Sequence, residues 1–373
     1  MRNVETEQEI QDMARGAVFL GSGGGGDPYV SELFLRAQLK RGHKARIIEL
    51  DELDDDAFVI SIAGIGAPSV YVEHLVSEKL LLRLFARAEA FFGRRIDALI
   101  SAEIGGSNSI IPLGVSAICG VPVIDGDGMG RAMPHIEMTT FSIFGARATP
   151  AILMDECGTC MILETADDRT AEDVCRAAAD SVGAEIMGAL YPMSGKLAKT
   201  CVVRGTLEQT LQIGRRIREA RTASGDVFTE LLAYLNTGGR FAKILFDGKI
   251  VDVIHETRDG WHWGKVTLSG LRGGGDHLTL EVQNEYTVAR LNGRTVTVVP
   301  DIISVLDRES GEPLTGEMLR YGQRVKVVGY SSHPLLKRPE SLEVMGPRMF
   351  GIDEDFVPIE ELHASAVTTA GSK

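Results

Sequence analysis

The sequence of 373 residues lacks several features that mark whole classes of proteins. No apolar run reaches the roughly 20 residues that a membrane-spanning helix needs, which argues against an integral membrane protein. The segment 1–16 is polar and lacks the apolar stretch of a signal peptide. Acidic residues outnumber basic ones, and the formal net charge of -13 argues against nucleic acid or an anionic membrane as a partner. We therefore expect a cytoplasmic protein that acts on a small molecule.

Cysteine and histidine are also scarce, with five and eight residues. The cysteines form an odd, scattered set, unlike a disulfide framework, so we expect free thiols. Cys157 and Cys160 fall in a predicted hairpin turn, without the second pair or nearby histidine that would complete a zinc site. The sequence has no His-x-His or His-x-x-x-His pair and no Gly-x-Ser-x-Gly motif. These absences argue against a histidine-rich zinc hydrolase and a hydrolase with a serine nucleophile.

Glycine, by contrast, is abundant, and many of the 42 glycines cluster in loops beside acids. Two such segments follow one another, Glu103-Ile-Gly-Gly and Asp125-Gly-Asp127-Gly-Met-Gly-Arg131. Short apolar runs at 96–100 and 121–124 precede them and are typical of buried strands in a parallel sheet. Ligands bind where loops leave the carboxyl ends of such strands. The sequence therefore predicts the site at this edge of the sheet.

The remaining pattern predicts an α/β protein with two domains and a mainly parallel sheet in the first. We expect the N-terminal α/β domain at residues 1–165 and a second domain at 166–373, which is β-rich over 236–355. No linker separates them, so the domains should pack tightly. Predicted strands are 17–20, 45–50, 58–63, 96–100, 121–124, a hairpin at 151–155 and 160–164, 198–203, 244–256, 261–271, 277–291, 295–300, 324–330 and 341–345. Predicted helices are 6–16, 29–40, 70–78, 79–92, 110–119, 168–181 and 206–222.

The loop Gly21–Gly26 formally matches the Gly-x-Gly-x-x-Gly fingerprint of dinucleotide-binding proteins, between a predicted strand and a helix. Four consecutive glycines match many patterns by accident, and Asp27 would place a carboxylate close to a bound pyrophosphate. A second interpretation is another ligand or an oxyanion, held by backbone N–H groups of Gly23, Gly24 and Gly25. A tight structural turn is the third.

The acids Glu103, Asp125 and Asp127 also admit several interpretations. One carboxyl group can stay neutral because its neighbour is charged, which gives a general acid–base pair. The same acids can hold a hard cation such as Mg²⁺, although the sequence identifies too few ligands for a full oxygen cage. Alternatively, Asp125 and Asp127 cap the following turn and pair with Arg131. We favour catalysis over a metal site at Asp125 and Asp127, and expect no cofactor.

Eight segments of the chain together resemble the S-methyl thiohydantoin desulfurase family, formerly a domain of unknown function and often labelled hydantoinase- or oxoprolinase-related. The resemblance implies an N-terminal and a C-terminal domain, with a boundary near residue 165, and hydrolysis of a C–S bond to give a hydantoin and methanethiol. Cys157, Cys160 and His135 depart from the family pattern, so we do not expect them in the site. The segments are FLGSGGGGDP (19–28), EIGGSNS (103–109), GVPVIDGDGMGRAMP (120–134), YPMSG (191–195), QNE (283–285), VPDIISVLD (299–307), LRYGQRV (319–325) and GPRMFG (346–351).

This reaction suggests a role for each candidate residue. Water attacking the thioimidate carbon needs a carboxylate base, and the departing thiolate needs donors or a proton. We predict Asp125 or Asp127 as the base, Glu103 as a partner that raises its pKa, and Arg131 or the glycine-loop amides as the anion stabiliser. Asn108 and the polar triplet Gln283, Asn284 and Glu285 are the predicted ring-recognition groups, although the triplet can equally be a sheet edge.

Two other function classes stay open. A nucleotide-dependent oxidoreductase would bind a nicotinamide or flavin at the glycine loop, and a non-catalytic subunit of a hydantoinase-like complex would need a partner chain. We further expect a symmetric homo-oligomer, because an apolar-rich chain of this size commonly buries further surface in one.

Overall fold

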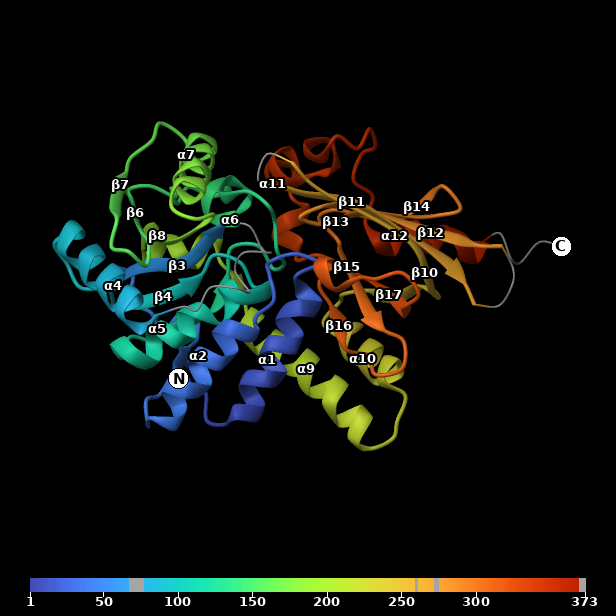
Figure 1. The fold of residues 1–373 in the computed structure, drawn as a ribbon, viewed down its shortest axis with the longest axis horizontal. Helices are drawn as coiled ribbons and strands as arrows, with labels where there is room; N and C mark the ends of the chain where they lie inside the picture. Colours follow the sequence, from blue (N-terminus) through green and yellow to red (C-terminus); the bar gives the residue numbers. More distant parts are fainter. Residues whose placement is uncertain (67–76, 259–260, 272–274, 369–373) are drawn as a thin grey trace.

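The computed structural model describes residues 1–66, 77–258, 261–271 and 275–368, and contains two sheets that lie side by side (Figure 1). The first sheet has the strand order β1-β2-β5-β4-β3-β8-β6-β7, with β9 beside β5. Its strands are β1 (Arg2–Asn3), β2 (Arg46–Ile48), β3 (Phe58–Gly66), β4 (Ala98–Ser101), β5 (Val123–Asp127), β6 (Ala151–Met154), β7 (Cys160–Leu163), β8 (Glu185–Ser194) and β9 (Val203–Arg204).

The second sheet is antiparallel, with the order β14-β13-β12-β11-β10-β17-β15-β16. Its strands are β10 (Ala242–Arg258), β11 (Trp261–Gly270), β12 (His277–Gln283), β13 (Glu285–Leu291), β14 (Arg294–Val298), β15 (Ile302–Asp307), β16 (Pro313–Leu314) and β17 (Arg324–Tyr330). Figure 1 shows the helices α4 and α5 beside the first sheet and α12 beside the second.

The helices are mostly amphipathic, and among the described residues none is long and apolar enough to cross a membrane. They are α1 (Glu7–Leu20), α2 (Tyr29–Lys40), α4 (Glu78–Phe92), α5 (Ile111–Cys119), α6 (Thr140–Ile143), α7 (Asp168–Ser181), α8 (Gly195–Cys201), α9 (Thr206–Thr222), α10 (Val227–Leu235), α11 (Pro339–Met345) and α12 (Ile359–Thr368). Short 3₁₀ turns are η1 (Leu50–Glu52), η2 (Gly106–Ser109), η3 (Ile136–Met138), η4 (Gly316–Met318), η5 (Pro334–Lys337) and η6 (Pro347–Phe350).

The fold class predicted from the sequence is confirmed. The strands β2, β5, β4 and β3 are neighbours and run parallel, with Val123 of β5 opposite Ile47 on one side and Leu99 on the other. Antiparallel strands extend this parallel core at both sides. The carboxyl ends of β4 and β5 lead into Glu103 and the loop after Asp127, as the apolar runs predicted. The hairpins β6–β7 and β13–β14 are also confirmed.

The predicted strand at 17–20 is wrong, because these residues form the last turn of α1. The helix begins with a capping box, in which the Thr6 side chain accepts from Glu9 N–H and the Glu9 carboxylate accepts from Thr6 N–H. Its buried residues Ile10, Met13 and Ala17 continue the helical spacing into the apolar run. A short apolar run cannot by itself distinguish a buried strand from a buried helix.

Two further predicted strands are helical in the structure. Residues 198–203 lie mostly in α8, and 341–345 belong to α11, whose first residue is Pro339, a favoured first helical position. The long strand β8 was not predicted, although it is almost entirely buried between β3 and β6. The predicted helix at 70–78 lies largely outside the described residues.

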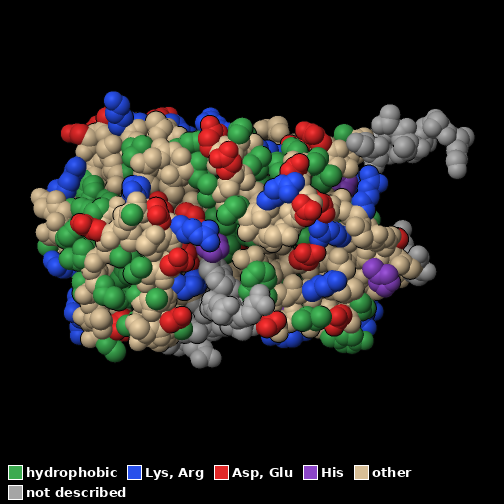
Figure 2. Space-filling view, turned by 90° about the horizontal axis from the view of Figure 1, so that it is seen from above, with side chains coloured by type: hydrophobic (Ala, Val, Ile, Leu, Met, Phe, Trp, Pro, Cys, Tyr) green, Lys and Arg blue, Asp and Glu red, His purple; other side chains and the backbone are tan. Residues whose placement is uncertain are grey.

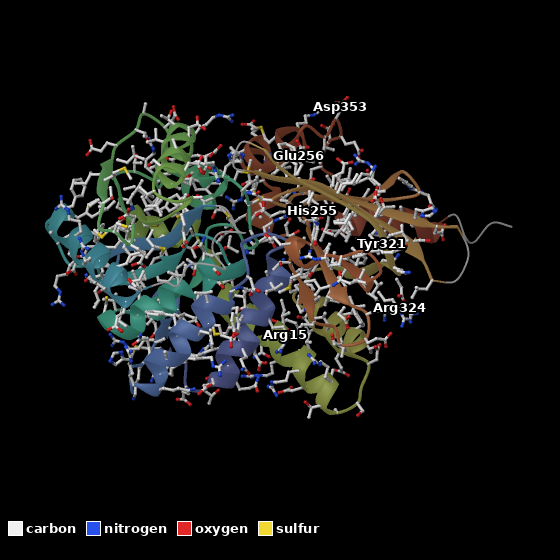
Figure 3. All side chains as sticks on the ribbon, viewed as in Figure 1. Arg15, His255, Glu256, Tyr321, Arg324 and Asp353 are labelled. Atoms are coloured by element: carbon white, nitrogen blue, oxygen red, sulfur yellow. The ribbon has the colours of Figure 1, made fainter. Side chains whose placement is uncertain are left out.

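The two halves of the chain share one hydrophobic core, which contains residues of α1, the first sheet, α9 and the second sheet. The helices α1 and α9 approach so closely that a Cβ atom on Gly16 would lie 2.0 Å from the carbonyl oxygen of Thr210. Across the boundary, Arg15 of α1, which is labelled in Figure 3, forms an ion pair with Glu312 at 2.9 Å. The strands β8 and β9 also belong to the first sheet, so the sheets themselves divide after residue 204 rather than near 165.

Candidate functional site

The glycine loop Gly21–Gly26 brings three distant segments of the chain together. The N–H of Tyr286 donates to the carbonyl of Ser22 at 2.7 Å, and the N–H of Ser107 donates to the carbonyl of Gly25 at 3.0 Å. No side chain fits here, since a Cβ atom on Gly24 would lie 2.1 Å from Oε1 of Glu285. The loop therefore fixes the position of Glu285 relative to the segment after β4.

A cavity of about 130 Å³ opens beside this loop. Gly25 and Gly26 form part of its wall, and within the described part of the chain their N–H groups have no hydrogen-bond acceptor. These N–H groups can thus stabilise negative charge in the cavity. Its ionisable and amide lining residues include Glu103, Asn108, His135, Glu172, Arg176 and Glu285.

Glu103 reaches the cavity from the end of β4. Its Oε1 accepts a hydrogen bond from Nδ2 of Asn108 at 2.8 Å. Asn108 is itself fixed by the backbone of Gly64, whose N–H donates to Oδ1 at 2.8 Å and whose carbonyl accepts from Nδ2 at 3.2 Å. The pKa of Glu103 is raised to about 7, mainly by burial and in smaller part by the charge of Asp127, while the Asn108 hydrogen bond opposes the shift. A carboxyl group with this pKa can accept and return a proton near neutral pH.

Asp127 is buried near Glu103 but does not line the cavity. Its Oδ2 accepts from the N–H groups of Met129 and Gly130, at 2.9 and 2.8 Å, so it caps the following turn. Its Oδ1 is buried and has no hydrogen-bond partner among the described residues. Burial raises its pKa to about 7. This position suits a group that modifies the pKa of Glu103 rather than one that touches a substrate.

Asp125 also lies outside the cavity. Its Oδ1 accepts from the N–H groups of Leu207 and Glu208, at 2.8 and 3.3 Å, so the carboxylate caps the N-terminus of α9. Burial raises its pKa to about 6 against these two hydrogen bonds. Because Asp125 and Asp127 bind the backbone amides of different segments, the structure gives no support to a shared Mg²⁺ site. The placement favours a structural role for Asp125.

Glu285, at the start of β13, closes the cavity from the second sheet. Its side chain is buried, and its Oε2 has no hydrogen-bond partner in the part of the chain that the structure describes. Burial, together with the nearby Glu103, raises the pKa of Glu285 well above its usual value, although the charge of Arg131 opposes the shift. A protonated Glu285 at neutral pH can donate a hydrogen bond or a proton.

Arg131 is fully buried and does not line the cavity. Its guanidinium group donates to the backbone carbonyls of Ala132, Tyr286, Pro300 and Asp301. Burial lowers its pKa to about 10, and the charges of Glu285 and Asp301 oppose this shift. Arg131 therefore joins the loop after β5 to the second sheet, and it forms no ion pair with Asp125 or Asp127 in the described structure.

The other sequence-predicted residues divide between the cavity and its surroundings. Asn284 lines the cavity from the turn between β12 and β13, where its φ is 57°, whereas Gln283 ends β12 outside the cavity. Gly23 packs against the ring of Tyr286. Asp27 accepts from the N–H of Tyr29 at 2.9 Å and lines a separate surface hollow with Arg15 and Met318.

Sequence reasoning missed one wall of the cavity, formed by His135, Glu172, Arg176 and Tyr191. His135 was set aside because it departs from the resemblance. Glu172 and Arg176 lie one helical turn apart on α7, a spacing common on solvent-exposed helices. This pair, His135 and Tyr191 are far apart in the sequence and form no recognisable motif, so only the fold brings them together.

The helix before the glycine loop also bears on the nucleotide alternative. The dinucleotide fingerprint needs a strand that ends at the first glycine, and here α1 ends there instead. The loop amides remain an anion site, but the βαβ arrangement that binds a dinucleotide is absent from residues 1–40.

Comparison with known proteins agrees with this architecture. An X-ray crystal structure of a Chromobacterium violaceum protein, the structural-genomics target CvR68, is similar to this chain with a TM-score of 0.81 and 23% identity. The match covers 96% of this chain and 100% of that chain and shows a shared fold. No curated protein matches the sequence. The S-Me-THD-like N-terminal domain matches residues 8–165, and the S-Me-THD-like C-terminal domain matches residues 166–359. Because the two domain matches span almost the whole chain, the protein belongs to the S-Me-THD-like family, in agreement with the resemblance found in the sequence.

Proposed function

We propose that the protein hydrolyses the C–S bond of an S-methyl thiohydantoin, giving a hydantoin and methanethiol. The observation that carries this proposal is Glu103, a cavity-lining carboxyl group with a pKa of about 7 held in one orientation by Asn108. Family membership supports the substrate class. The proposal reassigns the base from Asp125 or Asp127 to Glu103, because both aspartates lie outside the cavity.

The first step is addition of water to the carbon that bears sulfur. Glu103 accepts a proton from the attacking water, while protonated Glu285 donates its proton to the ring nitrogen of the C=N bond. The resulting tetrahedral carbon carries a hydroxyl, the S-methyl group and a ring N–H. The free N–H groups of Gly25 and Gly26 stabilise negative charge that develops in the cavity.

The second step is loss of methanethiol. The C–S bond breaks as the hydroxyl oxygen forms the carbonyl of the hydantoin, and its proton returns to Glu285. Glu103 gives its proton to the departing thiolate. Both carboxyl groups therefore regain their starting protonation states, and the net reaction consumes one water.

The substitution Glu103→Gln tests this assignment. Removing a general base typically costs 10²- to 10⁴-fold in rate, so kcat for methanethiol release should fall by about that factor. Methanethiol is measured by headspace gas chromatography with purified protein and an S-methyl thiohydantoin. The melting temperature should not fall, because Gln can still accept from Asn108 and carries no buried charge.

Glu230→Gln is the matched control, since Glu230 is exposed on α10. It should keep the wild-type rate. Unchanged turnover in Glu103→Gln would remove this residue from catalysis. Wild-type protein that releases no methanethiol without a partner chain would instead favour the non-catalytic subunit.

A further inference from the structure

A second cluster of side chains lies at the cavity, on the wall that sequence reasoning missed. It consists of His135, Glu137 and Glu172, and one possible ligand atom from each lies within 4.8 Å of the others. His135 and Glu172 line the cavity itself. We propose that these three residues bind a divalent transition-metal ion, such as Zn²⁺ or Mn²⁺, with an open coordination position toward the cavity.

The fold holds these ligands in place through the backbone of η3. Glu172 of α7 accepts from the N–H of Ile136 at 2.9 Å through Oε2. The hydroxyl of Tyr191 donates to the carbonyl of the same residue at 2.6 Å. His135 and Glu137 flank Ile136, so both contacts fix the segment that carries them. Such contacts around the ligands orient a metal site and typically change its affinity 10- to 100-fold.

Glu137 provides independent support. Its Oε2 is buried and has no hydrogen-bond partner among the described residues, and its side chain is only 15% exposed. Its Oε1 lies 3.9 Å from Nδ1 of His135. A buried carboxylate oxygen without a partner is costly, and a cation held between the imidazole and the carboxylates would remove that cost.

The composition of the cluster indicates the class of metal. One imidazole nitrogen and two carboxylates suit first-row divalent ions, whereas Mg²⁺ and Ca²⁺ prefer oxygen ligands alone. Three protein ligands leave a further position for a small molecule, as in catalytic zinc sites.

The competing interpretation is an ion-pair network that docks α7 against η3. Arg176 donates to Oε1 of Glu172 at 2.7 Å and so neutralises part of the cluster's charge. Each carboxylate oxygen has two lone pairs, so Glu172 can accept from Arg176 and still contact a metal. The two interpretations differ in what the protein binds, which makes them separable.

A role for the metal follows if the proposed function holds. The leaving group of that reaction is methanethiolate, and thiolates are preferred ligands of Zn²⁺. The open position would accept the sulfur as the C–S bond breaks, after which Glu103 returns a proton to it. This part of the inference rests on the proposed function, whereas metal binding itself does not.

The direct test is isothermal titration with ZnCl₂ and MnCl₂. The background is Cys157→Ser with Cys160→Ser, because both thiols are exposed and can bind Zn²⁺ themselves. We expect one ion per chain, with at least tenfold weaker binding in His135→Ala and in Glu137→Gln. His277→Ala changes an exposed histidine elsewhere and should bind as the background does. Far-UV circular dichroism shows that each variant is folded.

The metal site would be overturned, and the ion-pair network favoured, by either of two results. One is no binding to the background protein, and the other is an affinity in His135→Ala and Glu137→Gln equal to that of the background protein. The thiolate role has its own readout. Sodium methanethiolate added to the Co²⁺-loaded background protein should produce a sulfur-to-cobalt charge-transfer band, and no band would overturn that role. Glu103→Gln separates the two proposals, since it should lower kcat by about 10²- to 10⁴-fold and retain metal affinity. Metal binding without desulfurase activity would count against the proposed function alone.

Discussion

At the scale of single residues, the site depends on carboxyl groups whose pKa is raised by burial. Desolvation is the largest cause of the raised pKa of Glu103, Asp127 and Glu285. The charge of Asp127 also raises the pKa of Glu103, and the charge of Glu103 raises that of Glu285. Asp127 reaches no substrate, yet its charge contributes to the raised pKa of Glu103. In the proposed mechanism, Glu103 is the base, Glu285 is the acid and Asp127 is a neighbour that modifies the pKa of Glu103.

These raised pKa values predict how stability changes with pH. Glu103 has a pKa of about 7 when folded and an ordinary value of 4.5, so the native state binds more protons than the unfolded state between these values. The stability that protonated Glu103 contributes to the native state is therefore lost as the pH rises from about 4.5 through about 7. Glu103→Gln should reduce the loss in unfolding free energy between pH 5 and pH 8 by about 2 to 3 kcal/mol.

Urea denaturation of both proteins at pH 5 and pH 8 measures this difference. Glu230→Gln, at an exposed position, should follow the wild-type pH dependence. Parallel curves for wild type and Glu103→Gln would mean that Glu103 ionises as it does in the unfolded chain.

At the scale of elements, the acidic end of β5 contributes to the surroundings of the site and also anchors a helix. Asp125 caps α9, and α9 packs directly against α1, which ends at the glycine loop. The placement of Asp125, which was predicted to be catalytic, thus favours a structural role. The steric limit at Gly16 shows how little space separates the two helices.

Asp125→Ala tests this structural role. The N–H groups of Leu207 and Glu208 would lose their acceptor in a buried position, and we expect a loss of about 1 to 2 kcal/mol in unfolding free energy. Turnover per folded molecule should stay within a few-fold of wild type, because Asp125 lies outside the cavity. A loss of kcat as large as that of Glu103→Gln, at unchanged stability, would restore Asp125 as a catalytic residue.

At the scale of the whole molecule, the two halves of the chain are interdependent. Strand β8 follows the boundary near residue 165, yet it lies between β3 and β6 in the first sheet. The cavity likewise combines Glu103 of one half with Glu285 of the other. Figure 2 shows a face on which acidic and basic side chains are interspersed across both halves.

This arrangement predicts that a fragment of residues 1–165 does not fold. Without β8, the buried edges of β3 and β6 would be exposed to water with unpaired backbone groups. A fragment of residues 1–235 retains β8, β9 and α9 and should show more secondary structure by circular dichroism at equal concentration. A soluble, cooperatively unfolding 1–165 fragment would contradict the prediction.

Local patterns in the sequence were sufficient for much of the architecture. The helices α7 and α9 and the strand β17 have the predicted bounds, since each combines a clear start signal or alternation with a long, regular pattern. The apolar run followed by an acidic glycine segment also located Glu103 and the loop after β5. Such signals are properties of neighbouring residues, which the chain carries before it folds.

Tertiary structure decided the rest, because the remaining questions concern which distant groups share a space. Residues 17–20 continue α1, and the adjoining Gly16 packs closely against Thr210 of α9, which lies far away in the sequence. Long-range contacts also distinguish Glu103 from Asp125. Glu103 lines the cavity, whereas Oδ1 of Asp125 accepts a hydrogen bond from the N–H of Leu207. Orientation and desolvation are set by these long-range contacts, and they determine which carboxyl group can act as a base.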